Sequence, residues 1–350
     1  MTAPTPRPRL PRLHRPVRQV GALMLLAVVL QAAAAAGMFL VAGPLNSLKV
    51  LASARWPWVL AAVGGLAVSL SCYYFGYRGV YEAEGGPCLG RRRMRAVVTA
   101  AFSGFLVLGG SKVDRYVLRA AGVDESDVRV RSVGLSGFEM GVLSLVGTGA
   151  AVDVLVAGPG RIPASVTWPW ALAPLPGFVL AFWLAGRFRE RPRLRKVLGG
   201  WVGSSLDAVY LIRALFRRPH LHGAGLAGMT GFWIAEMFAG WAGLAAFGYR
   251  MNVGSFILGF ATGMVITRRT GPLAGAGLLE IALPLSLWYC GAPLAPAVAG
   301  TLLYRLAAVW PASALAASGI RTLKAMGQAH LAGAARVGSR PVTSPQAVEP

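Results

Sequence analysis

Ionisable side chains within long apolar runs are the residues of this sequence that could do chemistry. They are few: Asp114, Arg115, Glu139, Glu236, Glu280 and Arg305. A charge inside a membrane span is costly unless another group or water compensates it, so such residues usually mark a functional site. The chemistry that they could support is recognition of a charged lipid headgroup.

Arg305 lies in the middle of an apolar run, between GTLLY and LAAVWP, too deep to reach the membrane surface easily. Because a guanidinium pairs bidentately with phosphate, Arg305 is a candidate clamp for a headgroup phosphate. The alternative is a structural ion pair with Glu280 or Glu236. The sequence favours neither interpretation over the other.

Glu280 closes a glycine-rich segment and could hold a cationic headgroup, couple protons or neutralise Arg305. Glu236 lies in a run rich in tryptophan and glycine and could face the same cavity. We expect the substrate site to be formed by the following residues: Arg305, Glu280, Gly275, Gly277, Tyr304, Glu236, Arg115 and Glu139.

Patterns typical of catalytic or metal centres are missing from the sequence. No GxSxG, HExxH or P-loop pattern occurs, and the four histidines fall in loops or termini. The three cysteines are scattered without metal-ligand spacing: Cys72, Cys88 and Cys290. We therefore expect no catalytic residue, no metal and no cofactor.

The composition is that of a membrane protein. Of 350 residues, 55% are hydrophobic and only 14% are charged, whereas a soluble domain carries about 25% charged residues. The net charge is +22, but the basic residues gather between apolar runs, as the positive-inside rule requires. That distribution argues against a nucleic-acid partner.

About eight membrane spans are expected: Val20–Ala42, Trp56–Tyr77, Val133–Ala157, Thr167–Gly186, Ala224–Gly248, Val253–Thr267, Gly271–Tyr289 and Ala292–Ser318. Alternate loops are strongly basic and nearly free of charge, which places both termini in the cytoplasm. The expected organisation is a disordered basic leader (1–19), a single transmembrane domain (20–318) and a disordered cytoplasmic tail (319–350). The many arginines, alanines and glycines suggest a bacterial protein of the plasma (inner) membrane.

Two segments do not fit a simple count of spans. Ala96–Gly110 is short and has basic residues on both sides, so it is expected to form a re-entrant hairpin on the cytoplasmic face. Trp201–Arg218 has an apolar face opposite a charged face. It is expected to lie on the cytoplasmic leaflet among anionic headgroups, and the alternative is packing on loops of the same protein.

Two glycine-interrupted elements, Phe102–Leu118 and Arg268–Glu280, join a short apolar piece to glycines and then to charge. Broken segments at corresponding places in two halves of a chain point to a transport site near the membrane midplane. Their exposed N–H groups would favour an anion such as phosphate. The alternative is that these glycines only allow close helix packing.

The stretch from Gly271 to Ala317 resembles the closing signature of the lysylphosphatidylglycerol synthase transmembrane family. The shared features are a Pro/Gly-rich turn, a glutamate, a helix ending near Gly-Ala-Pro and an alanine-rich helix with Leu-Tyr-Arg and a later proline. Here these features are Pro272, Gly275, Gly277, Glu280, Gly291, Tyr304, Arg305 and Pro311. The first half is similar too, with YYFGYRGVY before a basic loop and VGLSGFEMGVLSLV around Glu139.

The chain departs from the family in its first re-entrant element. Members usually carry Asn and Pro-Gly there, followed by Gly-Glu and an arginine, whereas this chain has Gly109, Gly110, Lys112, Asp114 and Arg115. No synthase domain is recognised after Ala317, so the resemblance implies the stand-alone membrane unit rather than the synthase activity. That unit flips phospholipids or related amphiphiles between leaflets.

The expected function is therefore flippase-like translocation of a phospholipid or lipid-linked amphiphile, with membrane lipids as partners. The alternatives are a membrane-embedded enzyme on a lipid-linked substrate and an accessory subunit of a lipid-modifying enzyme. An enzyme would need an acid/base pair at one membrane surface, whereas the charges singled out here are expected to be buried.

Overall fold

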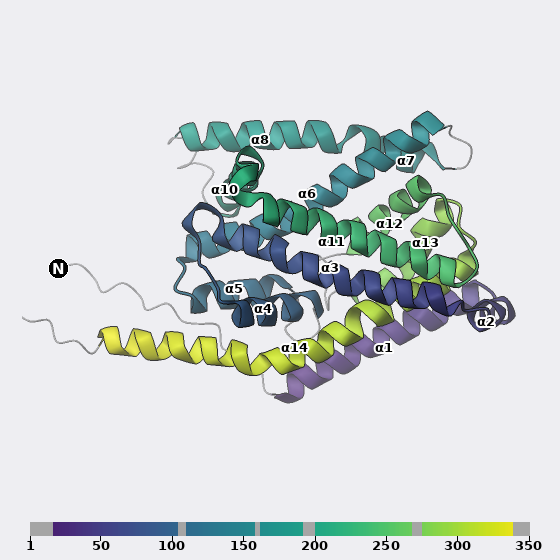
Figure 1. Ribbon diagram of the computed structural model, residues 1–350, viewed down its shortest axis with the longest axis horizontal. Helices are drawn as coiled ribbons and strands as arrows, with labels where there is room; N and C mark the ends of the chain where they lie inside the picture. Colours follow the sequence, from purple (N-terminus) through teal and green to yellow (C-terminus); the bar gives the residue numbers. More distant parts are fainter. Residues whose placement is uncertain (1–16, 104–109, 158–161, 192–199, 268–274, 339–350) are drawn as a thin grey trace, which may run out of the picture.

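The computed structural model describes residues 17–103, 110–157, 162–191, 200–267 and 275–338. Within those ranges the regular elements are all helices, gathered into one bundle (Figure 1). Their bounds are α1 Val17–Val41, α2 Pro44–Ala52, α3 Trp56–Glu82, η1 Ala83–Gly85, α4 Arg91–Ser103, α5 Gly110–Ala120, α6 Glu125–Ala157, α7 Ala164–Leu172, α8 Pro174–Glu190, α10 Trp201–Arg217, α11 Pro219–Ala246, α12 Val253–Thr267, α13 Leu278–Tyr289 and α14 Leu294–Gly338. The predicted helical bundle is confirmed.

Four helical stretches of the described chain are long and apolar enough to cross a membrane: Trp56–Gly85, Glu125–Ala157, Ala164–Glu190 and Leu294–Ala329. The number rises to five if the sharply bent pair α1–α2 counts as one span. A multi-pass membrane protein is thus supported, but not the expected count of eight. Helices α12 and α13 have 15 and 12 residues, too few to cross a core of about 30 Å at about 1.5 Å per residue.

Helices α3 and α11 lie side by side and approach each other through glycines (Figure 1). A Cβ added to Gly79 would lie 2.7 Å from the Cα of Gly225, and one added to Gly228 would lie 2.7 Å from the nitrogen of Gly76. Neither distance leaves room for a side chain. Small residues of this kind let two helix backbones meet inside a membrane.

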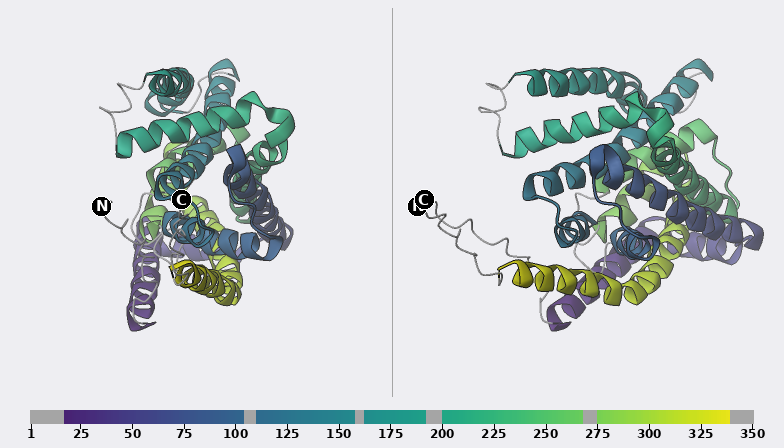
Figure 2. Two further views of the ribbon diagram at one scale, coloured as in Figure 1. Left: turned by 90° about the vertical axis from the view of Figure 1, so that its left-hand side faces the viewer. Right: turned by 60° about the vertical axis from the view of Figure 1, so that its left-hand side comes forward.

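Helix α14 continues well past the expected end of the transmembrane domain at Ser318. Its later part lies along one edge of the bundle, below α4 and α5 (Figures 1 and 2). A Cβ added to Gly319 would lie 3.2 Å from the Cβ of Ala96 on α4. The Tyr116 hydroxyl of α5 donates to the carbonyl of Leu323 at 3.3 Å. Helix α14 is thus continuous past Ser318 to Gly338 and packs on the bundle as far as Leu323, while the expected division into leader, transmembrane domain and tail stays a prediction. Residues 339–350 lie outside the described ranges, as do residues 1–16 of the expected leader.

Helix α10 corresponds to the amphipathic segment expected on the leaflet surface. Its apolar side chains Ala208, Ile212 and Leu215 are buried, and the helix packs against α6 and α8, beside which Figure 2 shows it. Arg213 also turns inwards, since its Nη1 donates to the carbonyl of Phe182 on α8 at 3.2 Å. Phe216, the remaining residue of the expected apolar face, is exposed. Most of this face therefore packs on the helix bundle rather than on loops, and the position of the helix at the cytoplasmic leaflet stays a prediction. An amphipathic pattern requires burial of one face but does not identify what covers it.

Candidate functional site

One face of α3 carries a row of hydroxyl groups. Ser69, Tyr73, Tyr77 and Tyr81 follow one another at intervals of four residues, which places them on one side of the helix. All four side chains are buried. A hydroxyl can both donate and accept a hydrogen bond, so this hydroxyl row can satisfy acidic side chains inside the bundle.

Three buried carboxylates meet the hydroxyl row, and each comes from a different helix. The contacts, along α3 towards its C-terminus, are Ser69 Oγ donating to Glu236 Oε1 of α11 at 2.6 Å, Tyr73 Oη donating to Glu139 Oε2 of α6 at 3.0 Å, and Tyr81 Oη donating to Asp114 Oδ1 of α5 at 3.1 Å. The exposed fractions of the three acids are 0–1%. These acids are therefore interior groups of the bundle and not parts of a wet surface.

Two further donors tie neighbouring helices to the same acids. The Tyr304 hydroxyl of α14 donates to Oε2 of Glu236, so this carboxylate receives hydrogen bonds from two helices. The indole nitrogen of Trp233 on α11 donates to the backbone carbonyl of Glu139 at 2.7 Å. Helices α3, α6, α11 and α14 are thus joined through polar contacts in the bundle interior.

Aromatic rings enclose the middle of the hydroxyl row. The ring of Tyr73 stacks on Phe232 with centroids 4.4 Å apart and meets Tyr77 and Phe102 edge-on at 4.8 and 5.8 Å. Phe102 is the penultimate residue of α4, so this short helix also reaches the interior. Such packing excludes bulk water and strengthens the electrostatic interactions of the enclosed polar groups.

Arg305 and Glu280 form an ion pair at the start of α13. Nε of Arg305 donates to Oε1 of Glu280 at 2.8 Å, and the other carboxylate oxygen accepts the Gly277 N–H at 2.8 Å. Glu280, the third residue of α13, therefore caps the start of this helix and holds the arginine at the same time. Gly277 has φ +84°, a left-handed conformation that favours glycine.

Two polar atoms of α14 beside this pair have no hydrogen-bond partner within the described ranges. They are Nη2 of Arg305 and Oγ1 of Thr301, and both atoms are buried. Because they lie four residues apart, they share one side of the helix. A buried polar group without a partner is costly, so such a pair is a natural place for a ligand.

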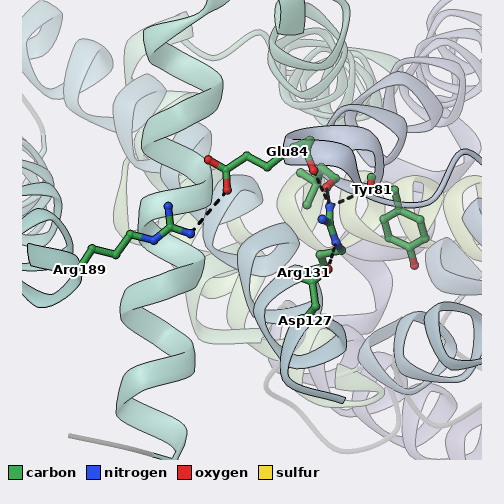
Figure 3. Close-up of polar contacts among 7 residues, drawn as sticks. Tyr81, Glu84, Asp127, Arg131 and Arg189 are labelled. Atoms are coloured by element: carbon green, nitrogen blue, oxygen red, sulfur yellow. Dashed lines mark hydrogen bonds and ion pairs between the residues drawn. The ribbon is translucent and has the colours of Figure 1, made fainter. Parts of the chain in front are cut away.

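Arg131 of α6 is a buried arginine at the C-terminal end of α3 (Figure 3). Its Nη1 donates to three backbone carbonyls, those of Val80, Tyr81 and Ala83, at 2.8–3.0 Å. Its Nε donates to Asp127 at 2.8 Å. Since a helix ends with unsatisfied carbonyls and partial negative charge, a buried guanidinium is well matched to this position.

The residues expected to form one site fall into two groups. Glu236, Tyr304 and Glu139 belong to the interior polar contacts, whereas Arg305, Glu280 and Gly277 meet at the start of α13. Adjacent residues 304 and 305 of α14 thus serve different groups. Of the two alternatives for an ion pair of Arg305, the structure has Glu280 as the partner.

Two other predicted site residues are placed differently. The Arg115 side chain is exposed, while its neighbour Asp114 is buried against Tyr81, so Arg115 does not face the interior groups. Gly275 has φ +74° just before α13. Most of the expected break, including Pro272, lies outside the described residues.

Sequence reasoning missed the four hydroxyl donors of α3 and Arg131, but not Tyr304. The signal for the donors was the four-residue spacing of a serine and three tyrosines within an apolar run, which predicts a polar stripe on one helix face. Arg131 carried no such signal. It follows three charged residues near the start of α6, where a surface position is the usual expectation.

Across the described residues, no cluster of three or more His, Cys, Asp or Glu side chains is arranged to hold a metal ion. Comparison with protein-family models and with curated proteins gives no match to this chain. The resemblance to the lysylphosphatidylglycerol synthase transmembrane family therefore stays a prediction.

Proposed function

We propose that this multi-pass membrane protein translocates a phospholipid or related lipid-linked amphiphile between leaflets. The observation that supports the proposal is the pair of buried polar atoms on α14, Nη2 of Arg305 and Oγ1 of Thr301, which lack hydrogen-bond partners in the described chain. Both are donors, and a phosphate oxygen is the kind of acceptor that a guanidinium prefers. A lipid phosphate would satisfy both atoms at once.

The neighbouring start of α13 suits the same ligand. The first N–H groups of a helix have no partner within the helix and carry partial positive charge, which favours anions. Glu280 holds Arg305 through Nε and leaves the terminal Nη2 for the ligand. In this proposal the ion pair orients the guanidinium, so the structural and the binding interpretation of Arg305 both apply.

The proposal includes a membrane topology. In it Ala96–Gly110, of which residues 104–109 lie outside the described ranges, forms a re-entrant hairpin on the cytoplasmic face, and both chain termini are cytoplasmic. The packing of α4 against α5 is compatible with such a hairpin. The crossings in this proposal are the four apolar spans, the bent pair α1–α2 and the 28-residue helix α11, whereas the described helices α12 and α13 are too short to cross by themselves. The host membrane is the bacterial plasma membrane, and a lipid-modifying enzyme is a candidate partner.

The test is lipid translocation by purified protein in liposomes of phosphatidylcholine and phosphatidylglycerol. A small fraction of the lipid carries a fluorophore on an acyl chain, with the headgroup phosphate unmodified. A membrane-impermeant reductant bleaches the outer leaflet, and the rate at which the remaining signal becomes accessible is measured. We expect Arg305→Lys and Thr301→Val each to lower this rate, because each removes a hydrogen bond to phosphate.

The matched control is Arg321→Met, which removes an exposed arginine from the same helix. The double variant Arg305→Met with Glu280→Gln removes the ion pair without leaving a buried charge. If that double variant inserts normally and flips lipid at the wild-type rate, Arg305 is only a structural partner and the phosphate site is refuted.

A further inference from the structure

We infer that α4, α5 and the adjoining part of α14 form a docking surface for the headgroups of anionic phospholipids. Its exposed basic side chains, which we call the basic surface, are Arg91, Arg92, Arg93 and Arg95 of α4, Lys112 and Arg115 of α5, and Lys324 of α14. Arg321 is not a member, because it is two positions from both Gly319 and Leu323 and so lies on the opposite side of α14 from these packed residues. The inference does not rest on the proposed function, since a lipid can dock without being flipped.

The fold brings these cations together from distant parts of the chain. Helix α14 packs along α4 and α5 (Figure 1). The Tyr116 hydroxyl of α5 donates to the carbonyl of Leu323, across 207 positions of the chain. Arg115 and Lys324 are the sequence neighbours of these two residues, so this contact brings two cations to the same end of the bundle. The positive-inside rule requires basic residues on one side of the membrane, but it does not require them to gather in this way.

Acidic side chains do not neutralise the basic surface. Asp114 is the one acid among the described residues of α4, α5 and the part of α14 after Ser318, and it is buried at 0% exposure. None of the members forms an ion pair with a described residue. The acids on either side of α4 and α5 along the chain hold arginines outside the basic surface, with Asp124 as the exposed exception; those acids are Glu82, Glu84, Glu125 and Asp127. A large excess of positive charge is therefore left for a ligand.

The basic surface lies at the edge of the membrane. After a short connection, α4 follows the apolar span Trp56–Gly85, and α5 is followed in the same way by the span Glu125–Ala157. Lys324 lies near the end of the span Leu294–Ala329. Long basic side chains near span ends reach the headgroup region. In the proposed topology this is the cytoplasmic side, whose leaflet carries the anionic lipids.

The position of the arginines within α4 also favours an anionic ligand. Arg91, Arg92 and Arg93 form the first turn of this helix, which contains no acid. Because the start of a helix carries partial positive charge, cations there destabilise the helix, whereas anions stabilise it. A headgroup phosphate at this turn would reverse the effect, since it would meet both the helix end and the guanidinium groups. Met94 and Val97 are buried against the bundle, and the three arginines are exposed on the outside.

The partner that we infer is the lipid headgroup rather than a soluble polyanion. Clusters of about 4–8 Lys and Arg directly beside a membrane span are typical of surfaces that bind anionic lipids. A soluble polyanion would have to approach the same negatively charged leaflet, which repels it. Headgroups are already present at the membrane edge at high local concentration and reach the basic surface by lateral diffusion.

The experiment measures which lipid surrounds the full-length protein at rest. Phosphatidylcholine bilayers that contain the protein receive a trace of phosphatidylglycerol or phosphatidylcholine with a spin label on an acyl chain. Electron paramagnetic resonance then gives the fraction of each labelled lipid whose motion the protein restricts. We expect the wild type to prefer phosphatidylglycerol by about threefold or more at low salt, and we expect concentrated salt to weaken this preference. The triple variant Arg91→Gln, Arg92→Gln and Arg93→Gln should lose at least about half of it, because it removes three of the charges.

The matched control removes the same amount of charge from the other end of the spans. Its substitutions are Lys49→Gln, Arg55→Gln and Arg250→Gln, all at exposed positions near the start of α3 or the end of α11, and it should keep the wild-type preference. A third variant with lysine at positions 91, 92 and 93 keeps the charge and should keep the preference too. Equal elution volume and thermal stability show that each variant is folded.

Three results would overturn the inference. The first is a wild-type protein without preference for phosphatidylglycerol. The second is an equal loss in the two glutamine variants, which would assign the preference to net charge alone. The third is a loss in the lysine variant as large as in its glutamine counterpart, which would show that charge is not what attracts the lipid. Tight binding of a DNA duplex to the wild type in phosphatidylcholine bilayers, without any lipid preference, would identify a soluble polyanion as the partner instead.

The flipping assay, run on the same variants, separates this inference from the proposed function. A preference for phosphatidylglycerol that depends on the arginines of α4, without any lipid flipping, supports the basic surface and overturns lipid translocation. Flipping by a protein without lipid preference overturns the basic surface and leaves lipid translocation standing. Faster flipping of phosphatidylglycerol than of phosphatidylcholine, with the difference lost in the glutamine variant of α4, supports both.

Discussion

Replacing Arg131 by methionine should destabilise the protein strongly, although the residue lies far along the chain from α3. Methionine fills similar volume but donates no hydrogen bond. The carbonyls of Val80, Tyr81 and Ala83 would then lose the donor that they share at 2.8–3.0 Å. Each buried carbonyl without a partner costs about 1–3 kcal/mol.

The separate losses do not simply add, because a relaxed chain or a water molecule would satisfy some of these carbonyls. We expect Arg131→Met to cost about 3–5 kcal/mol, which lies between the loss at one carbonyl and the sum over three. The contribution of the ion pair is small by comparison. Asp127 is 45% exposed, and exposed pairs contribute about 0–1 kcal/mol.

The assay is thermal unfolding in detergent, followed by tryptophan fluorescence. Asp127→Asn should lower the midpoint by no more than a few degrees, whereas Arg131→Met should lower it several times as much. A second variant tests the geometry from the other side. A Cβ on Gly86 would lie 2.0 Å from the Tyr81 carbonyl oxygen and 2.2 Å from Nη1 of Arg131, so Gly86→Ala should also displace the guanidinium. If Arg131→Met unfolds at the midpoint of Asp127→Asn, the carbonyl contacts do not stabilise the fold and the reasoning is refuted.

Three other perturbations test separate parts of the structure. In a cysteine-free background, cysteines at positions 93 and 112 should both react with an impermeant reagent only from the cytoplasmic side; labelling of exactly one of them from outside would show that α4–α5 crosses the membrane. Gly225→Leu should separate α3 from α11 and lower the thermal midpoint by several degrees. The control Gly64→Leu on α3 should change the midpoint little, because a Cβ added there meets nothing within 4 Å. Equal effects of the two variants would contradict the packing argument. Gly277→Leu should slow lipid flipping at least as much as Arg305→Lys, because a side chain there would sit on a left-handed backbone and its Cβ would lie 3.2 Å from the Leu30 carbonyl oxygen. Unchanged flipping would show that the start of α13 plays no part in transport.

The sequence predicted the helices well because apolar runs of membrane length leave few alternatives to a helix. The expected runs beginning at Trp56 and Val253 correspond to α3 and α12, which begin at those residues. The packing partners of two segments could not be predicted. The pattern of Trp201–Arg218 required that one face be covered, and the residues after Ser318 are small and mildly polar, but the structure shows that neighbouring helices pack against both segments. Local pattern contains no information about which distant surface is available.

The site was predicted in part for the same reason. An acid within an apolar run is conspicuous, so Glu139, Glu236 and Glu280 could be singled out from the sequence. Their partners could not be assigned, because Ser69 meets Glu236 across 167 positions of the chain. Arg305 was open to pairing with either glutamate, and the choice of Glu280 depends on how α13 is placed beside α14.

Helix α14 carries Arg305 and, further along, Leu323, whose carbonyl accepts the hydrogen bond from Tyr116 of α5. Between them the helix is continuous, and Pro311 interrupts its hydrogen-bond ladder. From residue 305 to residue 323 the helix advances eighteen steps, or about 27 Å at about 1.5 Å per residue. If the later part tilted by about 5° at Pro311, Leu323 would swing by roughly 1–2 Å, given about 18 Å of rod beyond the proline. A slight bend at Pro311 would therefore displace Leu323 far enough to break the Tyr116 hydrogen bond.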